Sequence, residues 1–161
     1  MGYDIYIQTA DGKQPLQGDE KYFHFAYTAM PRTLDAMHNF GMLIELPVPD
    51  QPKLSDFGLT GKDLQPGTDP SPEVQARIDA FRAAYFAVKD VAQPEPKGIP
   101  AYKLRYNDGF LTTVGEITAA LATYEAHPHV AMAEMPVGDL TWPRWVAFLR
   151  RARAHGGFRT H

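Results

Sequence analysis

Two alternating segments near the N-terminus constrain the fold more than any other feature of the sequence. Residues 3–9 alternate between apolar and polar side chains, and the aromatic-rich residues 21–28 repeat this period of two. That period is typical of a strand with one buried face. We therefore predict two antiparallel strands that cover a core with one face and meet water with the other.

Four later segments carry the start signals of helices. These helices are predicted to begin near Pro31, at Ser71-Pro72, at the capping box of Thr113 and Glu116, and near Trp142. Between the second and third of them, residues 101–106 and 110–113 flank Asn107-Asp108-Gly109. Because Asn, Asp and Gly accept positive φ, this arrangement predicts a β-hairpin.

Together these segments predict an α+β fold, with a small antiparallel sheet of about four strands packed with about four helices. The 161 residues suit one layered domain, residues 1–161. Within it, a Pro-rich stretch at about residues 47–70 is predicted to be a long loop. Whether that loop is a lid or merely a connection stays open.

The absence of cysteine excludes disulfides and thiolate metal sites, and it fits a reducing cytoplasm. No signal peptide and no run of about 18 apolar residues is visible, so we expect a soluble protein without a membrane partner. The common phosphate, dinucleotide, hydrolase and zinc motifs are missing. We therefore expect no cofactor and favour a non-enzymatic role. His127 and His129 are weak candidates for metal ligands. The alternative is that they belong to a solvated turn.

The charge distribution is the most distinctive feature for function. All 19 acidic residues precede residue 140, whereas five arginines follow it. On a helical wheel Arg144, Arg151 and His155 lie within about 40° of one another, beside the apolar stripe. Arginine forks on such a ridge bind carboxylates or phosphates, although cations near a helix C-terminus also complement its dipole. The predicted binding residues are Arg144, Arg151, His155, Phe148, Arg159 and His161.

The open face of the predicted sheet offers a second, weaker site. If the first two strands pair, Asp4 lies beside His24 and orients its ring as a general base. The alternative is an ordinary cross-strand polar pair. Lys103 and Arg105, from the predicted hairpin, would join the same face.

Several segments, spread in order over nearly the whole chain, carry a family resemblance: Met1-Gly2-Tyr3-Asp4, Gly98-Ile99-Pro100, Asn107-Asp108-Gly109, Trp142-Pro143-Arg144-Trp145-Val146 and His155-Gly156-Gly157-Phe158-Arg159-Thr160-His161. They resemble a family of small proteins from actinobacteria and their bacteriophages. The resemblance implies an accessory product of phage or other mobile DNA, acting in the cytoplasm of the bacterial host. It implies no particular activity, cofactor or catalytic residue.

Three functions are compatible with the sequence. The first is an interaction protein that binds a host protein or a small anionic ligand through the arginine ridge. The second is a small enzyme that uses His24 and Asp4. The third is a weak nucleic-acid binder using the basic C-terminal segment, and the net charge of −3 argues against it. The sequence does not indicate an oligomeric state.

Overall fold

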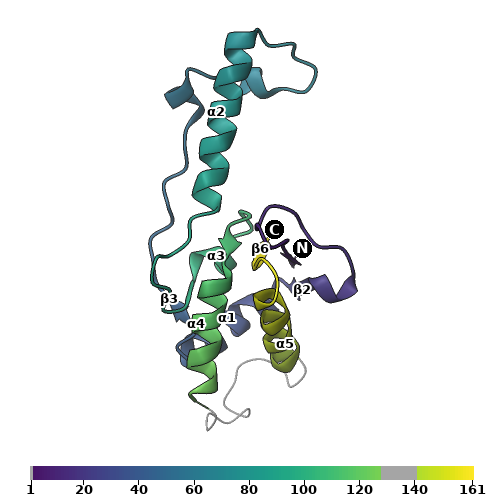
Figure 1. Ribbon diagram of the computed structural model, residues 1–161, viewed down its shortest axis with the longest axis vertical. Coiled ribbons are helices and arrows are strands. Elements are labelled where there is room, and N and C mark those ends of the chain that lie inside the picture. Colours follow the sequence, from purple (N-terminus) through teal and green to yellow (C-terminus); the bar gives the residue numbers. More distant parts are fainter. Residues whose placement is uncertain (1, 128–140) are drawn as a thin grey trace. The chain divides into compact units, whose positions relative to one another are not determined.

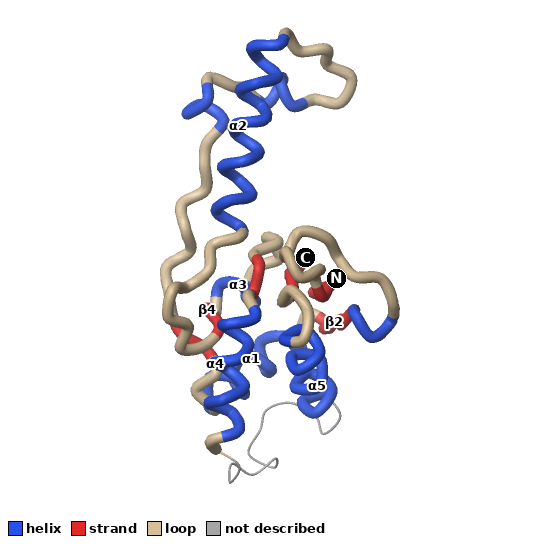
Figure 2. Tube along the Cα trace, viewed as in Figure 1, coloured by secondary structure: helices blue, strands red, loops and turns tan. Residues whose placement is uncertain are grey.

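The computed structural model describes residues 2–127 and 141–161 (Figure 1). The chain forms two compact units, Met1–Pro47 with Ala92–His161, and Val48–Val91. The larger unit contains β1 (Gly2–Ile7), η1 (Asp19–Lys21), β2 (Tyr22–Ala26), α1 (Ala29–Asn39), β3 (Leu43–Ile44), β4 (Ile99–Pro100), α3 (Tyr102–Arg105), β5 (Leu111–Thr112), α4 (Val114–Glu125), α5 (Thr141–Arg153) and β6 (Phe158–Thr160). The smaller unit contains η2 (Leu54–Phe57), η3 (Gly61–Leu64) and α2 (Pro72–Lys89). The predicted α+β class is confirmed (Figure 2).

The main sheet has the strand order β2-β1-β6-β5, and every neighbouring pair is antiparallel. The predicted pairing of the first two strands is confirmed, with Asp4 opposite His24 and Tyr6 opposite Tyr22. Backbone hydrogen bonds of 2.7 Å join Asp4 to His161 in both directions. Asp4 is therefore flanked by His24 of β2 and by His161, the residue that follows β6. A separate parallel pair, β3 with β4, completes the larger unit.

One face of the sheet carries the core of the larger unit. The buried side chains of β1, β2 and β6 pack with those of α1, α4 and α5 in a single apolar cluster. The ring of Trp145 stacks on Phe148 and meets Phe25 edge-on, with centroids 5.5 Å and 5.0 Å away. Offset and edge-on ring pairs add to the stability gained from burial. With one face covered, the opposite face of β1 and β2 is left to polar side chains.

The helix boundaries follow the predicted local signals. At the start of α4, the Thr113 hydroxyl accepts from the Glu116 amide, and the Glu116 carboxylate accepts from the Thr113 amide at 2.9 Å. The predicted capping box is thus confirmed. After α5, Gly157 adopts φ +81°, and a Cβ there would overlap the carbonyl of Thr112. Only glycine fits this close approach between the end of α5 and β5.

The predicted hairpin at residues 101–113 is wrong. Residues 102–105 form the short helix α3, and β5 pairs with β6 instead. Tyr102, Lys103 and Leu104 are all buried, which a strand with alternating faces does not allow. Gly109 has the positive φ expected of the turn, at +71°, but this turn connects a helix to a strand. Lys103 is therefore not on the open sheet face, and Arg105 pairs with Glu45 at 3.2 Å.

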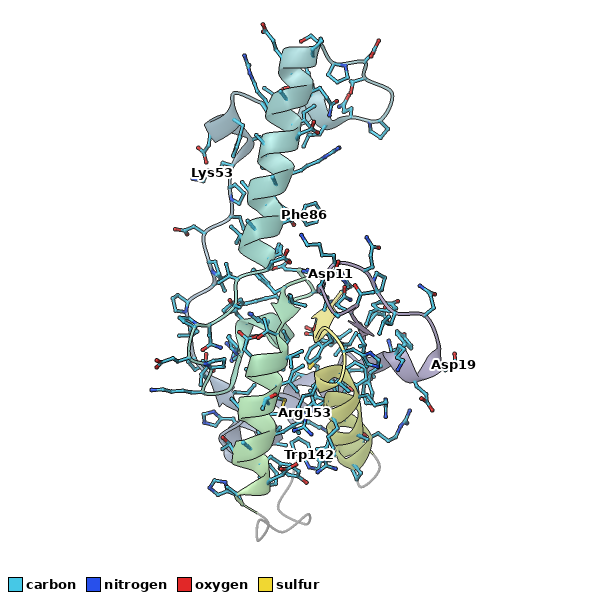
Figure 3. The ribbon with its side chains drawn as sticks, in the orientation of Figure 1. Asp11, Asp19, Lys53, Phe86, Trp142 and Arg153 are labelled. Atoms are coloured by element: carbon cyan, nitrogen blue, oxygen red, sulfur yellow. The ribbon has the colours of Figure 1, made fainter. Side chains whose placement is uncertain are left out.

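In the smaller unit, α2 begins as predicted, with the Ser71 hydroxyl accepting from the Val74 amide at 3.4 Å. The apolar side chains along α2 differ in their burial. Ile78 is buried, whereas Tyr85 is 36% exposed. Phe86 projects from the helix and is 59% exposed (Figure 3). The predicted loop at 47–70 contains the two short helices η2 and η3.

Candidate functional site

A surface depression of about 300 Å³ lies where α5 and η1 pack together. Arg144 and Arg151, three residues before and four residues after Ala147, lie on one side of α5. The short helix η1 supplies two acidic side chains, and β2 supplies two aromatic rings. The lining consists of Arg144, Ala147, Arg151, Asp19, Glu20, Tyr22 and Phe23. Figure 3 labels Asp19 in the connection between β1 and β2. We refer to these seven residues as the α5 depression.

Arg144 is the most available cation of the α5 depression. Its side chain is exposed, and its guanidinium carbon lies 5.8 Å from the ring centroid of Phe23. Among residues 2–127 and 141–161, it has no hydrogen-bond or ion-pair partner. A guanidinium over a ring gains cation–π attraction while keeping its N–H groups free. Arg144 can therefore donate its full fork to a bound group.

Arg151 is partly fixed in place. Its Nε donates to the backbone oxygen of Glu20 at 3.0 Å, and its guanidinium carbon lies 5.9 Å from the ring of Phe148. Phe148 itself is fully buried, so it supports Arg151 from below and does not reach the surface. The structure thus brings Arg144 and Arg151 to one depression, with Phe23 beneath Arg144 and Phe148 beneath Arg151.

His155 lies at the end of α5, where the Lys21 ammonium donates to its Nε2 at 2.9 Å. An ammonium has no acceptor, so the imidazole nitrogen must accept. This bond and the Arg151–Glu20 bond both tie η1 to α5. His155 therefore helps to hold the wall of the α5 depression and does not line it.

The remaining predicted binding residues lie elsewhere. Arg159 donates to the carbonyls of Gly109 and Gly12, each at 2.8 Å, and so connects two turns. His161 lies in register with Asp4, outside the α5 depression. Burial lowers the pKa of His161, as does the neighbouring Arg159, whereas Asp4 acts in the opposite direction. The structure does not place these two residues with Arg144 and Arg151.

The other arginines of the C-terminal segment do not join the α5 depression. Arg150 forms an exposed ion pair with Glu125 at 3.4 Å. Arg153, nine residues after Arg144, lies about 180° around the helix from it. Arg150, Arg151 and Arg159 all donate to acceptors of the protein itself. Because the C-terminal arginines are spread over different sides and several already donate within the protein, they offer little support for a continuous phosphate-binding track.

The open sheet face carries a hydrogen-bonded group centred on Asp4. Its Oδ1 accepts from the Tyr22 hydroxyl at 2.5 Å and from Nδ1 of His24 at 2.9 Å. These two bonds lower the pKa of Asp4, and the bond to Asp4 raises the pKa of Tyr22 to about 12. Asp4 and His24 are each close to half exposed. The arrangement fixes which nitrogen of His24 carries the proton, as a base-orienting carboxylate does.

The two metal candidates receive no geometric support within the described residues. His127 is exposed, and its Nδ1 lies 2.7 Å from the carbonyl of Thr123. His129 lies outside the described residues. Within residues 2–127 and 141–161, no three His, Asp or Glu side chains gather as a metal ion would need.

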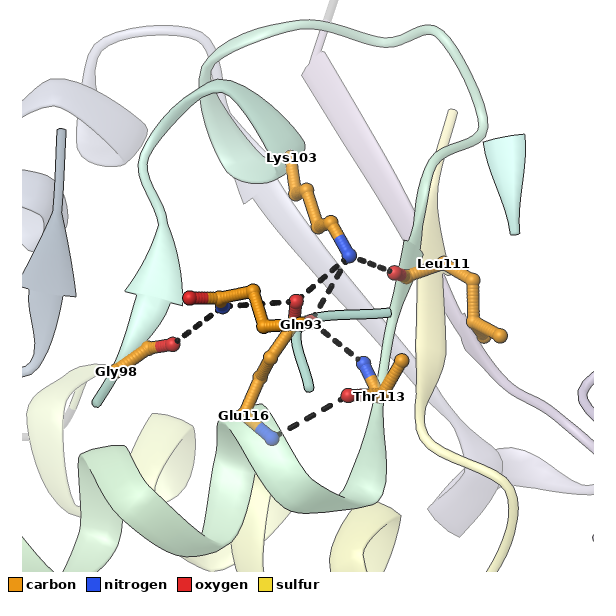
Figure 4. Close-up of polar contacts among 6 residues, drawn as sticks. All are labelled: Gln93, Gly98, Lys103, Leu111, Thr113 and Glu116. Atoms are coloured by element: carbon orange, nitrogen blue, oxygen red, sulfur yellow. Dashed lines mark hydrogen bonds and ion pairs between the residues drawn. The ribbon is translucent and has the colours of Figure 1, made fainter. Parts of the chain in front are cut away.

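A buried ion pair between Lys103 and Glu116 was not predicted from the sequence. Lys103 donates to both carboxylate oxygens of Glu116, at 2.8 Å and 3.0 Å, and to the carbonyl of Leu111 at 2.7 Å (Figure 4). Gln93 also donates to Glu116, at 3.0 Å. Both charged side chains are at most 1% exposed. A lysine inside the apolar run Ile99–Leu104 was the available signal, because a buried ammonium requires a buried acid.

Comparison with protein-family models, with curated proteins and with solved structures finds no match for this chain. Among the described helices, none is long and apolar enough to cross a membrane.

Proposed function

We propose that this protein acts by binding another protein, and that the α5 depression receives a carboxylate of that partner. The observation that carries this proposal is the guanidinium of Arg144, which is unpaired among residues 2–127 and 141–161 and is held over Phe23 beside a second arginine. Arginine forks donate two parallel hydrogen bonds to a carboxylate. Arginine and tyrosine are also the residues that most often dominate protein interfaces. On the resemblance to actinobacterial phage proteins, the partner would be a protein of the host cytoplasm.

A protein partner suits the α5 depression better than a small anion does. Its volume of about 300 Å³ is at the lower limit for small-molecule sites, which typically enclose their ligand. Two acids among the seven lining residues also weaken the attraction of a simple anion. A protein surface can place a carboxylate on Arg144 and spread further contacts over Tyr22 and Ala147.

Affinity capture from an actinobacterial lysate tests this proposal with three baits. These are the wild type, Arg144→Glu, and Arg153→Glu as a control with the same charge change on the opposite side of α5. We expect a protein captured by the wild type and by Arg153→Glu to be lost with Arg144→Glu. Equal capture by all three baits, or no specific capture, would contradict the proposal. Quantitative mass spectrometry provides the comparison.

A second candidate is a proton-transfer site at His24. It is favoured by the double hydrogen bond that Asp4 accepts from His24 and Tyr22, because such a carboxylate orients an imidazole as a general base. Hydrolysis of a panel of activated carboxylic and phosphoric esters tests it. Turnover that falls in both His24→Gln and Asp4→Asn would support the candidate. Turnover that is absent in the wild type or unchanged in both variants would remove it.

A further inference from the structure

The charges of the α5 depression are separated onto its two walls. Both arginines, Arg144 and Arg151, belong to α5, whereas both acids, Asp19 and Glu20, belong to η1. Within the described residues, neither acid forms an ion pair or a side-chain hydrogen bond. The two walls therefore face one depression with opposite charges that do not neutralise each other by direct pairing.

The distance between these walls is fixed by the fold. Arg151 of α5 donates to the backbone of Glu20, and Lys21 donates to His155, two residues after α5, so that two hydrogen bonds connect η1 to α5 and the turn that follows it. Burial of Phe23 anchors the strand that follows η1. A site whose walls are held at a fixed spacing costs little backbone reorganisation when it binds a matching ligand.

An occupant with only negative charge would gain attraction from the α5 wall and meet repulsion from the η1 wall. An occupant with only positive charge would meet the reverse. Electrostatic complementarity between the surfaces is what gives an interface its specificity. The matching occupant carries both signs of charge, on groups far enough apart to reach both walls.

We infer that the partner segment bound in the α5 depression is dipolar, with a carboxylate directed to Arg144 and Arg151 and a cationic side chain directed to Asp19 and Glu20. This inference rests on the proposed function, since it specifies the chemistry of the same partner. Glutamate and lysine four residues apart on one helix face present such a pair. The aliphatic stems of these side chains would pack on the rings of Tyr22 and Phe23.

Peptide titration followed by NMR tests the inference. The probes are three capped, alanine-rich helical peptides of about 15 residues that carry, four residues apart near their centre, Glu and Lys, Glu and Glu, or Lys and Lys. The readouts are the methyl signal of Ala147 and the Nε–H signal of Arg144. We expect the Glu/Lys peptide to bind at least about fivefold more tightly than either like-charged peptide. Equal or tighter binding of the Glu/Glu peptide, or no shift with any peptide, would overturn the inference.

Variants of the protein separate this inference from the proposed function. The double variant Asp19→Asn/Glu20→Gln should weaken binding of the Glu/Lys peptide, while the control Asp35→Asn/Glu95→Gln, with the same charge change at exposed sites elsewhere, should not. If Asp19→Asn/Glu20→Gln strengthens binding while Arg144→Glu abolishes it, the partner is simply acidic. The dipolar inference then fails and the proposed function stands. If Arg144→Glu changes the binding of no peptide, both fail.

Discussion

Replacing Lys103 by methionine is the most informative test of the fold. Methionine keeps the length and most of the volume of the lysine side chain but removes its charge. The variant leaves the Glu116 carboxylate fully buried, and among the described residues its remaining donors are Gln93 and the Thr113 amide. The carbonyl of Leu111 also loses the 2.7 Å bond from Lys103.

The expected cost follows from this burial. Removing one partner of a buried ion pair typically costs about 3–5 kcal/mol, because the other charge stays buried without compensation. For a chain of this size, about 1 kcal/mol corresponds to a shift of about 2–4 °C in Tm, so we expect a decrease of roughly 6–20 °C. The double variant Lys103→Met/Glu116→Gln removes both charges and keeps a capping side chain at Glu116. It should be more stable than Lys103→Met alone.

Urea unfolding followed by tryptophan fluorescence measures these differences. Trp142 and Trp145 both lie in the larger unit, so their emission reports its unfolding. The matched control is Arg105→Met, which breaks an ion pair of the same helix whose side chains are 48% and 63% exposed. Exposed pairs contribute about 0–1 kcal/mol, and the control should change little. If Lys103→Met costs no more than Arg105→Met, the interpretation of the buried pair is refuted.

Three further outcomes are expected. Gly157→Ala should prevent stable folding of the larger unit, as measured by circular dichroism, whereas Gly61→Ala should be neutral because a Cβ there meets nothing within 4 Å. Equal effects of the two substitutions would contradict the close packing at Gly157. Because hydrogen bonds hold the pKa of Asp4 below 3.8, they stabilise the fold above that pH, and this contribution is lost as the pH falls through the folded value. The stability difference between wild type and Asp4→Asn should therefore shrink in urea titrations below pH 3.8, and a constant difference would argue otherwise. In the same variant, the pKa of Tyr22 should fall from about 12 towards 10.0 in an NMR titration, whereas an unchanged value would remove Asp4 as the cause.

Local signals predicted much of the fold. The alternation of residues 3–9 and the Thr113/Glu116 capping box each depend on neighbouring residues, and both are confirmed. The predicted strand at residues 101–106 was wrong because the conformation of this segment depends on a distant contact. Lys103 reaches Glu116, thirteen residues away, and no local pattern encodes that pair. Tertiary interactions overrode the preference for a hairpin.

The candidate site was predictable only in part, for a similar reason. Helical spacing places Arg144 and Arg151 on one stripe of α5, and the structure has them in one depression. The sequence could not indicate that Asp19 and Glu20 form the opposite wall, because η1 is more than 120 residues earlier in the chain. Nor could the sequence indicate that Arg159 donates hydrogen bonds to two backbone carbonyls. Which charged side chains remain available for binding depends on the partners that folding places beside them.

Site-specific photo-crosslinking in living cells that express the protein would test most directly whether the α5 depression contacts a partner. A benzoylphenylalanine at Tyr22, which lines the depression, is compared with one at Tyr27, which is 63% exposed and does not line it. We expect a protein adduct from position 22 that is missing from position 27 and disappears when Arg144→Glu is added. Adducts of equal yield from both positions, or none from position 22, would contradict a binding role for this surface.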